Sequence, residues 1–166
     1  MYDVRFLGKK IAAIKKKNSN KLRLISEDGD QGYPGRVDLR VVMRLDGPRL
    51  TWEMDAVPDR VTPINLAQHL YFNLAGAGSV ADHVLWVDAD TYTPNGSDLV
   101  PLGRIVPVAG TEFDFRTPRR LGDGDGWDGN LMLNQTADTA ADVVGPDGMR
   151  LRVKTNQPGL QVYTSN

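Results

Sequence analysis

Side chains able to transfer protons or to hydrogen-bond a substrate are concentrated in one short segment. Its sequence reads Asn65-Leu66-Ala67-Gln68-His69-Leu70-Tyr71-Phe72-Asn73-Leu74-Ala75-Gly76. In a β-strand the side chains of such a segment alternate between two faces, so the segment is predicted to have one polar and one apolar face. The apolar face is interrupted only by Gln68. The opposite face consists of Asn65, Ala67, His69, Tyr71 and Asn73.

A face of this composition is suited to binding a sugar. Carboxamides can satisfy hydroxyl groups, a phenol offers a ring face and a donor, and an imidazole can move a proton near neutral pH. His69 is one of only two histidines in the chain and is the candidate catalytic residue. Asn65 and Tyr71 are candidate substrate ligands. The alternative is a surface strand whose histidine only hydrogen-bonds to a neighbour, and the pattern by itself is compatible with both.

The composition is that of an ordinary globular protein and argues against several functions. The chain has 166 residues, of which 40% are hydrophobic and 25% charged, and its net charge is -1. That balance provides no overall field for nucleic acid or an anionic membrane. Without cysteine there is no disulfide, thiolate metal site or cysteine nucleophile. No apolar run is long enough to span a bilayer, and the first residues lack the apolar core of a signal peptide. We expect one domain over residues 1–166, located in the cytoplasm.

Alternation of apolar and polar residues predicts strands along most of the chain. Residues 37–45 and 50–56 alternate in this way on either side of Asp46-Gly47-Pro48, which predicts a hairpin. Residues 149–153 show the same pattern, and residues 84–87 and 131–133 are shorter strand candidates. No stretch sustains a helical period. The fold class is therefore predicted to be mainly antiparallel β, a sandwich or an open barrel.

Two further stretches have simpler interpretations. Residues 94–118 have weak periodicity and are expected to form extended loops over the sheet. The run Lys15-Lys16-Lys17 could contact phosphate, but it has no interleaved aromatic residues. We interpret it as a solvated edge or hairpin, where lysines discourage pairing between sheet edges.

Other candidate residues also have a structural alternative. Asp123, Asp125 and Asp128 suggest calcium, but Trp127 occupies a position that needs an oxygen ligand, so a turn is favoured and no metal is expected. Trp127 could stack on a sugar or lie in the core, and it is a better stacking candidate than Trp86. His83 is interpreted as structural.

Several motifs, in order, are similar to those of one enzyme family. The segment from Asn65 to Gly76 resembles the signature Asn-Leu-x-x-His-x-Tyr-Phe-Asn-Leu of the aldose 1-epimerases, or galactose mutarotases. The other matching blocks are Asp28-Gly29-Asp30-Gln31-Gly32-Tyr33-Pro34-Gly35, Asp82-His83 with Tyr92-Thr93-Pro94, Pro107-Val108-Ala109-Gly110-Thr111-Glu112-Phe113-Asp114-Phe115-Arg116, and Leu160-Gln161-Val162-Tyr163-Thr164-Ser165-Asn166. Together they extend over nearly the whole chain.

The resemblance implies a β-supersandwich that interconverts the α and β anomers of free aldohexoses such as glucose and galactose, with no cofactor. One acid protonates the ring oxygen while one base removes the anomeric hydroxyl proton; the ring opens, rotates about C1–C2 and recloses. By motif match, His69 corresponds to the general acid. Asp128 corresponds to an aspartate that binds sugar hydroxyls, and Trp127 replaces the tyrosine before it.

The chain also departs from the family pattern. The family's catalytic glutamate comes after the block that ends here at Asn166, and its sugar-binding arginine and second active-site histidine come before the part matched by Met1. Gly129 stands where the family has a histidine, and Ser165 where it has a glycine. By resemblance the chain corresponds to roughly the middle half of a mutarotase, an incomplete domain.

Three hypotheses follow from the sequence. The chain is an aldose 1-epimerase, with activity impaired by truncation; or it is a catalytically inactive, mutarotase-like carbohydrate-binding module; or it is a truncated copy without a sugar function. A sandwich cut at both ends is expected to expose apolar faces and unpaired edges, so self-association is predicted.

Overall fold

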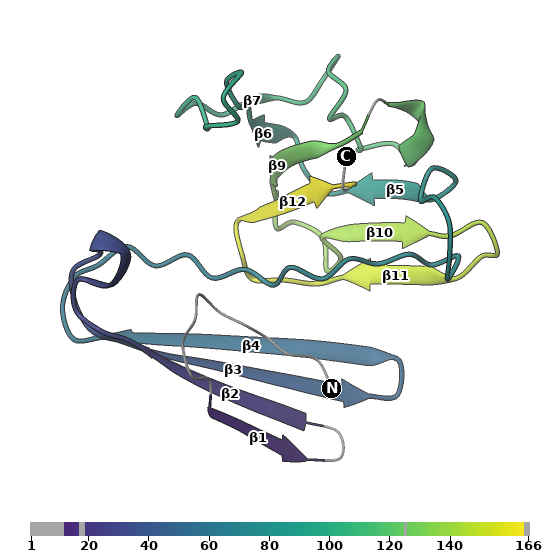
Figure 1. The fold of residues 1–166 in the computed structure, drawn as a ribbon. Coiled ribbons are helices and arrows are strands. Elements are labelled where there is room, and N and C mark those ends of the chain that lie inside the picture. The colour runs from purple at the N-terminus through teal and green to yellow at the C-terminus, as the bar shows by residue number, and fades with distance from the viewer. Residues whose placement is uncertain (1–11, 17–18, 125, 165–166) are drawn as a thin grey trace. The chain divides into compact units, whose positions relative to one another are not determined.

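The computed structural model describes residues 12–16, 19–124 and 126–164, with side chains from residue 19 onward (Figure 1). The described secondary structure is almost entirely strand. The strands are β1 (Ala12–Lys16), β2 (Ser19–Ser26), β3 (Val37–Asp46), β4 (Arg49–Pro58), β5 (Val84–Val87), β6 (Thr91–Thr93), β7 (Val106–Pro107), β8 (Arg119–Arg120), β9 (Asp128–Met132), β10 (Ala141–Val144), β11 (Arg150–Val153) and β12 (Gly159–Tyr163). Two short 3-10 helices, η1 (Asp30–Gly32) and η2 (Leu121–Asp123), complete the elements. No described helix could cross a membrane.

The chain divides into two compact units, Met1–Leu70 and Tyr71–Asn166. The first contains one four-stranded sheet in the order β1-β2-β3-β4. The second contains two four-stranded sheets, in the orders β11-β10-β5-β8 and β12-β9-β6-β7. All named strand pairs are antiparallel, so the predicted fold class is confirmed. A single domain over residues 1–166 stays a prediction.

The first unit is built around the predicted hairpin. β3 and β4 pair along their whole length, from Val37 opposite Pro58 to Asp46 opposite Arg49. Gly47 makes the turn possible because its φ of 54° lies in the left-handed region. β1 is an edge strand, as expected for a lysine-rich segment, although Lys17 lies outside the described residues.

The register gives this sheet two different faces. One face is apolar and consists of Leu22, Leu24, Val37, Leu39, Val41, Met43, Trp52, Met54 and Ala56. The other is charged: the Arg23 guanidinium donates to both carboxylate oxygens of Asp38, at 2.9 and 2.7 Å, and Arg40 donates to the same carboxylate. The hydrogen bonds from Arg23 are the main reason that the pKa of Asp38 lies well below its usual range.

A loop anchored by a carboxylate precedes β3. The Asp28 carboxylate accepts the backbone N–H of Gly35 at 2.7 Å and pairs with the Arg60 guanidinium. The hydrogen bond from Gly35, together with that from Arg60, lowers the pKa of Asp28. The match of Asp28 to Gly35 with a family turn thus falls on a real turn, which includes η1.

The prediction of a strand between Asn65 and Leu74 is wrong. These residues form no strand, and the chain has neither helix nor strand from Asp59 to His83. A strand needs a neighbour to accept and donate its ladder hydrogen bonds. Among the described residues no such neighbour exists for this segment. Alternation of side chains was therefore present without the pairing that would make it a strand.

The second unit is a small sandwich whose two sheets share one core. The buried cluster takes Leu85 and Val87 from β5, Leu131 from β9 and Ala141 from β10, and it also contains Ala89, Val108, Phe115 and Trp127. The strands predicted at 84–87 and 149–153 are confirmed as β5 and β11. The one predicted at 131–133 overlaps the end of β9, which begins at Asp128 and stops at Met132, one residue before Leu133. Residues 94–118 are mostly loop, as predicted, apart from β7 and an isolated bridge between Asn95 and Pro101.

Candidate functional site

Trp127 lies in the interior of the second unit. Its side chain is 1% exposed, and its ring centroid lies 4.8 Å from that of Phe115. The Cζ atom of Arg119 lies 5.0 Å from the Trp127 ring centroid. The indole N–H donates to the Leu121 carbonyl at 2.8 Å. A sugar could not reach this ring without displacing the core. The position favours the core alternative for Trp127 and corrects its selection as the stacking residue.

The glycine that replaces the family's histidine is explained by the same core. Gly129 is buried on β9, and a Cβ at this position would lie 2.3 Å from Cε1 of Phe113. That distance is far below van der Waals contact, so the Phe113 ring occupies the space that a side chain would need. Phe113 also packs against Trp127, at a centroid distance of 6.0 Å. This interior has no room for an imidazole at position 129.

Asp128 lies on the opposite, open face of the sheet, at the start of β9. The Gln161 carboxamide of β12 donates to an Asp128 carboxylate oxygen at 2.7 Å, and both side chains are exposed. Tyr163 stands directly opposite Asp128 in the register. Gln161 and Tyr163 lie within the block that resembles the family motif, but they were not among the predicted site residues. The alternation of β12, with Leu160 and Val162 facing the core, was the signal that could have identified them.

The polar face continues from β9 to β6. Asn130 stands opposite Gln161 on one side and Thr93 on the other. The Asn130 carboxamide donates to the Thr93 hydroxyl at 3.1 Å. Since residues opposite each other in an antiparallel pair point to the same face, the carboxylate, the two carboxamides and the hydroxyl form one polar surface.

Two tyrosines border this surface. The ring centroids of Tyr71 and Tyr163 lie 6.0 Å apart, with the planes inclined by 57°. Tyr71 is 59% exposed and Tyr163 38% exposed, so both rings contact each other and remain accessible. Tyr163 thereby connects two of the predicted site residues, Tyr71 and Asp128. The accessible aromatic rings of this site are tyrosines, because Trp127 is buried.

The remaining predicted residues belong to the first unit. Asn65 and His69 are both exposed. His69 precedes Tyr71 by two residues, so the covalent chain allows at most about 7 Å between their Cα atoms.

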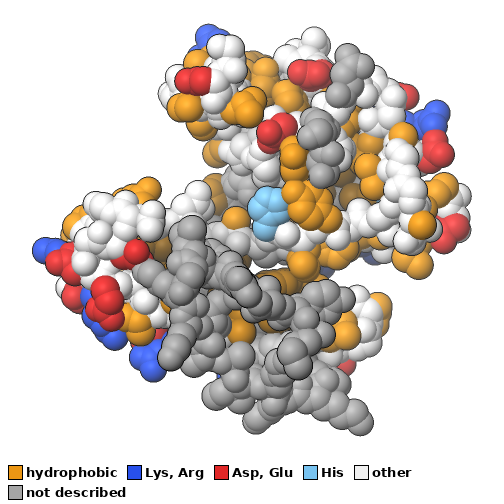
Figure 2. Space-filling model, in the orientation of Figure 1, with side chains coloured by type: hydrophobic (Ala, Val, Ile, Leu, Met, Phe, Trp, Pro, Cys, Tyr) orange, Lys and Arg blue, Asp and Glu red, His pale blue; other side chains and the backbone are white. Residues whose placement is uncertain are grey.

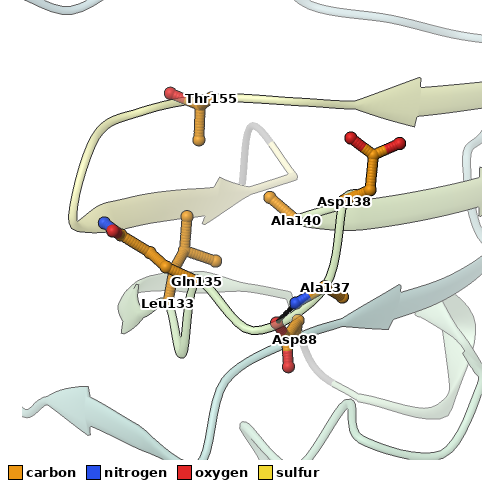
Figure 3. A pocket seen from close by; sticks show the side chains of 7 residues that line it. All are labelled: Asp88, Leu133, Gln135, Ala137, Asp138, Ala140 and Thr155. Atoms are coloured by element: carbon orange, nitrogen blue, oxygen red, sulfur yellow. Dashed lines mark hydrogen bonds between the residues drawn. The ribbon is translucent and has the colours of Figure 1, made fainter.

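A separate small cavity lies at one end of the second unit (Figure 3). Its volume of about 20 Å³ is the room that a single water molecule requires, so it cannot hold a hexose. It contains none of the predicted site residues. Its lining residues are Asp88, Leu133, Gln135, Ala137, Asp138, Ala140 and Thr155. Asp88 here fastens a loop: its carboxylate accepts from Thr136 and from the Ala137 backbone N–H, both at 3.2 Å.

The arrangement on the sheet face is able to bind hydroxyl groups. A carboxylate accepts hydrogen bonds, carboxamides donate and accept, and tyrosine rings offer an apolar surface to the C–H face of a sugar. Within the described part of the chain no group of three acidic or histidine side chains is placed to hold a metal ion; Asp125 lies outside it. The residues of this polar surface, Asp128, Gln161, Asn130 and Thr93, include no imidazole.

Comparisons with known proteins point to one family. A family model described as aldose 1-epimerase matches residues 4–166. The human galactose mutarotase is 40% identical over 153 residues, covering 86% of this chain and 45% of that protein. The Escherichia coli aldose 1-epimerase is 38% identical over 159 residues, covering 86% and 46%.

Solved structures give the same result. The aldose epimerase homologue from C. elegans superimposes with a TM-score of 0.86 at 26% identity, covering 95% of this chain and 52% of that one. The galactose 1-epimerase from Lactobacillus acidophilus superimposes with a TM-score of 0.80 at 33% identity, covering 92% and 49%. The chain thus spans about half the length of the relatives it matches.

Proposed function

Because the chain belongs to the aldose 1-epimerase family, we propose that it binds a free aldohexose and acts in the interconversion of its α and β anomers. Glucose and galactose are the proposed sugars. The observation that carries the proposal is the open sheet face on which Gln161 donates to Asp128 while Tyr71 and Tyr163 provide accessible rings beside them. Hydroxyl recognition needs such a combination of charged acceptor, carboxamide and apolar ring.

The proposed roles follow from the chemistry of the side chains. Asp128 and Gln161 bind sugar hydroxyls, with Asn130 beside them, and Tyr71 packs against the sugar ring. His69 is the proposed acid that protonates the ring oxygen as the C1–O bond breaks; its imidazole is exposed and therefore accessible. Asn65 is proposed as a further hydroxyl ligand. None of the chain's carboxylates stands in the motif of the family's glutamate base, so only the acid is assigned.

Polarimetry of freshly dissolved α-D-glucose tests the enzymatic proposal. We expect the His69→Ala variant to lower the catalysed rate by about 10²–10⁴-fold, the usual contribution of a positioned acid. The matched control is Asp55→Asn, an exposed carboxylate on β4 outside the proposed site. An unchanged rate in the His69 variant would contradict the assignment of the acid.

Binding is tested separately by calorimetric titration with galactose and glucose. Asp128→Asn should weaken binding by about 1.5–3 kcal/mol, the contribution of hydrogen bonds to a charged group. The matched control is Asp123→Asn, an exposed aspartate on η2. If the wild-type chain binds sugar and Asp128→Asn binds it equally well, Asp128 is not a ligand.

A catalytically inactive carbohydrate-binding module is the second candidate function. It is favoured by the polar surface itself, whose residues bind hydroxyls but include a single carboxylate, Asp128, and no imidazole. Calorimetric binding without any acceleration of mutarotation would establish this alternative. Neither binding nor acceleration would refute both candidates.

We also propose that the chain associates with further copies of itself and that it is located in the cytoplasm. Large apolar side chains are visible on the surface of the protein (Figure 2). In the loop before β7, four large apolar side chains are more than half exposed: Leu99, Val100, Leu102 and Ile105. Several exposed apolar side chains within one loop favour contact with another copy of the chain. Analytical ultracentrifugation should show concentration-dependent dimers; a monomer at all concentrations would contradict it.

A further inference from the structure

The second histidine of the chain is buried and holds a backbone group. His83 is 1% exposed, and its Nε2 accepts the backbone N–H of Leu74 at 2.9 Å. Accepting this bond requires Nε2 to be unprotonated, so the neutral ring carries its proton on Nδ1. Nδ1 has no hydrogen-bond partner among the described residues. The bond to Leu74 is therefore the one that the buried imidazole makes within the described part of the chain.

The backbone of His83 is itself fixed. Its N–H donates to the Val80 carbonyl at 3.0 Å, and its carbonyl accepts from the Leu121 N–H at 2.9 Å. These bonds tie the residue to the turn at Val80 and to the first residue of η2. Because its backbone is held by these hydrogen bonds, the His83 side chain can position a segment that has no regular secondary structure.

The segment that it holds has no strand or helix to define it. Three further contacts act on it: the Asn73 carboxamide donates to the Gly78 carbonyl at 2.8 Å, the Asn73 side-chain oxygen accepts from Ala75 at 3.0 Å, and Leu74 packs on Gly145. A Cβ at Gly145 would lie 2.8 Å from Cβ of Leu74, so this approach requires glycine. Asn73 is occupied with its own turn.

We propose that His83 is a positioning residue for the sugar-binding face. By holding the Leu74 backbone, it fixes Tyr71, three residues earlier, against Tyr163. Neither strand nor helix supports Tyr71–Leu74, so the acceptor on His83 acts together with the side-chain contacts of Asn73 and the packing of Leu74 to hold this segment. The part of the inference that concerns sugar rests on the proposed function; the hydrogen bond and its effect on Tyr71 do not.

Three substitutions separate the position of the acceptor from the polarity of the side chain. In His83→Gln the amide oxygen can take the place of Nε2. In His83→Asn it reaches only the place of Nδ1, and in His83→Leu there is no acceptor. The core variant Val87→Ala, on the strand β5 that begins directly after His83, is the matched control for general destabilisation because Val87 is 1% exposed and buried in the core.

Amide hydrogen exchange and NMR measure the structural effect. In His83→Leu and His83→Asn we expect the Leu74 amide to exchange at least about tenfold faster relative to the Leu121 amide, and the contacts between the Tyr71 and Tyr163 rings to weaken. His83→Gln should restore both. Val87→Ala should leave the ratio of the two exchange rates unchanged.

Sugar titration measures the functional effect. With galactose as the probe, the Leu and Asn variants should bind roughly three- to tenfold more weakly, because a Tyr71 ring that must be ordered on binding costs affinity. His83→Gln should bind within about twofold of the wild type. Gly145→Ala adds a methyl group against Leu74 without altering His83 and should reproduce the loss of galactose affinity. It replaces His83→Leu in this experiment if that variant does not fold.

The possible outcomes are distinguishable. If the wild type binds no sugar, the proposed function fails, while exchange at Leu74 and the tyrosine contacts still decide the role of His83. If the wild type binds and Gln and Asn behave alike, or if Leu74 exchange does not change, the positioning role is refuted. Restored exchange and restored affinity in Gln but not in Asn would support it.

Discussion

The two compact units bury the apolar side chains of their sheets to very different degrees. In the second unit, two sheets share an interior in which Val108 and Leu131 are fully buried. In the first, apolar and polar side chains alternate just as regularly along the described sheet. Val37, at 8% exposed, is nevertheless the one buried residue of the described strands β2, β3 and β4. Alternation thus accompanies strand pairing in both units, and among the described residues a buried cluster forms in the second unit, where two sheets contribute to it.

The difference predicts where stability and function should be sensitive. The second unit should respond to changes of volume, since its side chains are enclosed. The first should respond more to charge, since its hydrogen-bonded pairs at Asp38 and at Glu53 lie on an open sheet face. Four experiments test this difference between the two units.

The largest expected effect is that of Trp127→Ala. Removing this enclosed indole should cost about 3–5 kcal/mol of the free energy of unfolding, because the cavity cannot be refilled by Phe115 and Arg119. Trp52→Ala on β4 is the control, since Trp52 is only partly buried. Urea unfolding monitored by amide exchange in β9 and β3 measures both. Equal losses would mean that the first unit is as well packed as the second.

A smaller effect is expected from Gly129→Ala. The added methyl group meets the Phe113 ring, and such overpacking costs about 1–3 kcal/mol. In the double variant with Phe113→Leu the cost of the alanine should fall, since the obstructing ring is gone. Denaturant titration of the four members of this cycle gives the coupling. Strict additivity would show that Phe113 is not what excludes a side chain at position 129.

Asp88→Asn tests a polar anchor of the second unit. One carboxylate oxygen accepts from Asn134, and the other from Thr136 and Ala137. An amide placed here must turn its NH2 toward a donor, so we expect a loss of about 1–2 kcal/mol and faster exchange in the loop. Asp138→Asn, which removes only an exposed pair with Lys154, is the control. Identical stabilities would argue that the loop is held by its apolar contacts.

The smallest effect concerns pH and the first unit. The folded pKa of Asp38 is lowered by Arg23, so its contribution to stability is complete above the unfolded pKa of about 3.9. It is lost as the pH falls from there through the folded pKa. Thermal unfolding between pH 7 and pH 2 should show a shallower acid loss in Asp38→Asn than in the wild type. Asp55→Asn, on the same sheet, should follow the wild type.

Much of the fold was predictable because strand alternation and turns are local properties. The hairpin of β3 and β4 follows from apolar residues at every second position and from Gly47 between them. The matching blocks indicated the family, which the comparisons confirmed. By contrast, the strand predicted around His69 is not formed, because none of the described strands pairs with this segment.

The amino-acid sequence by itself determined which segments alternate, where the chain turns and which family motifs it carries. Only the tertiary structure decided that Trp127 belongs to the core, that Gln161 and Tyr163 join Asp128 on one face, and that His83 holds Leu74. These facts depend on which strand lies beside which and in what register. Register joins residues far apart in the chain, so no local pattern can state it.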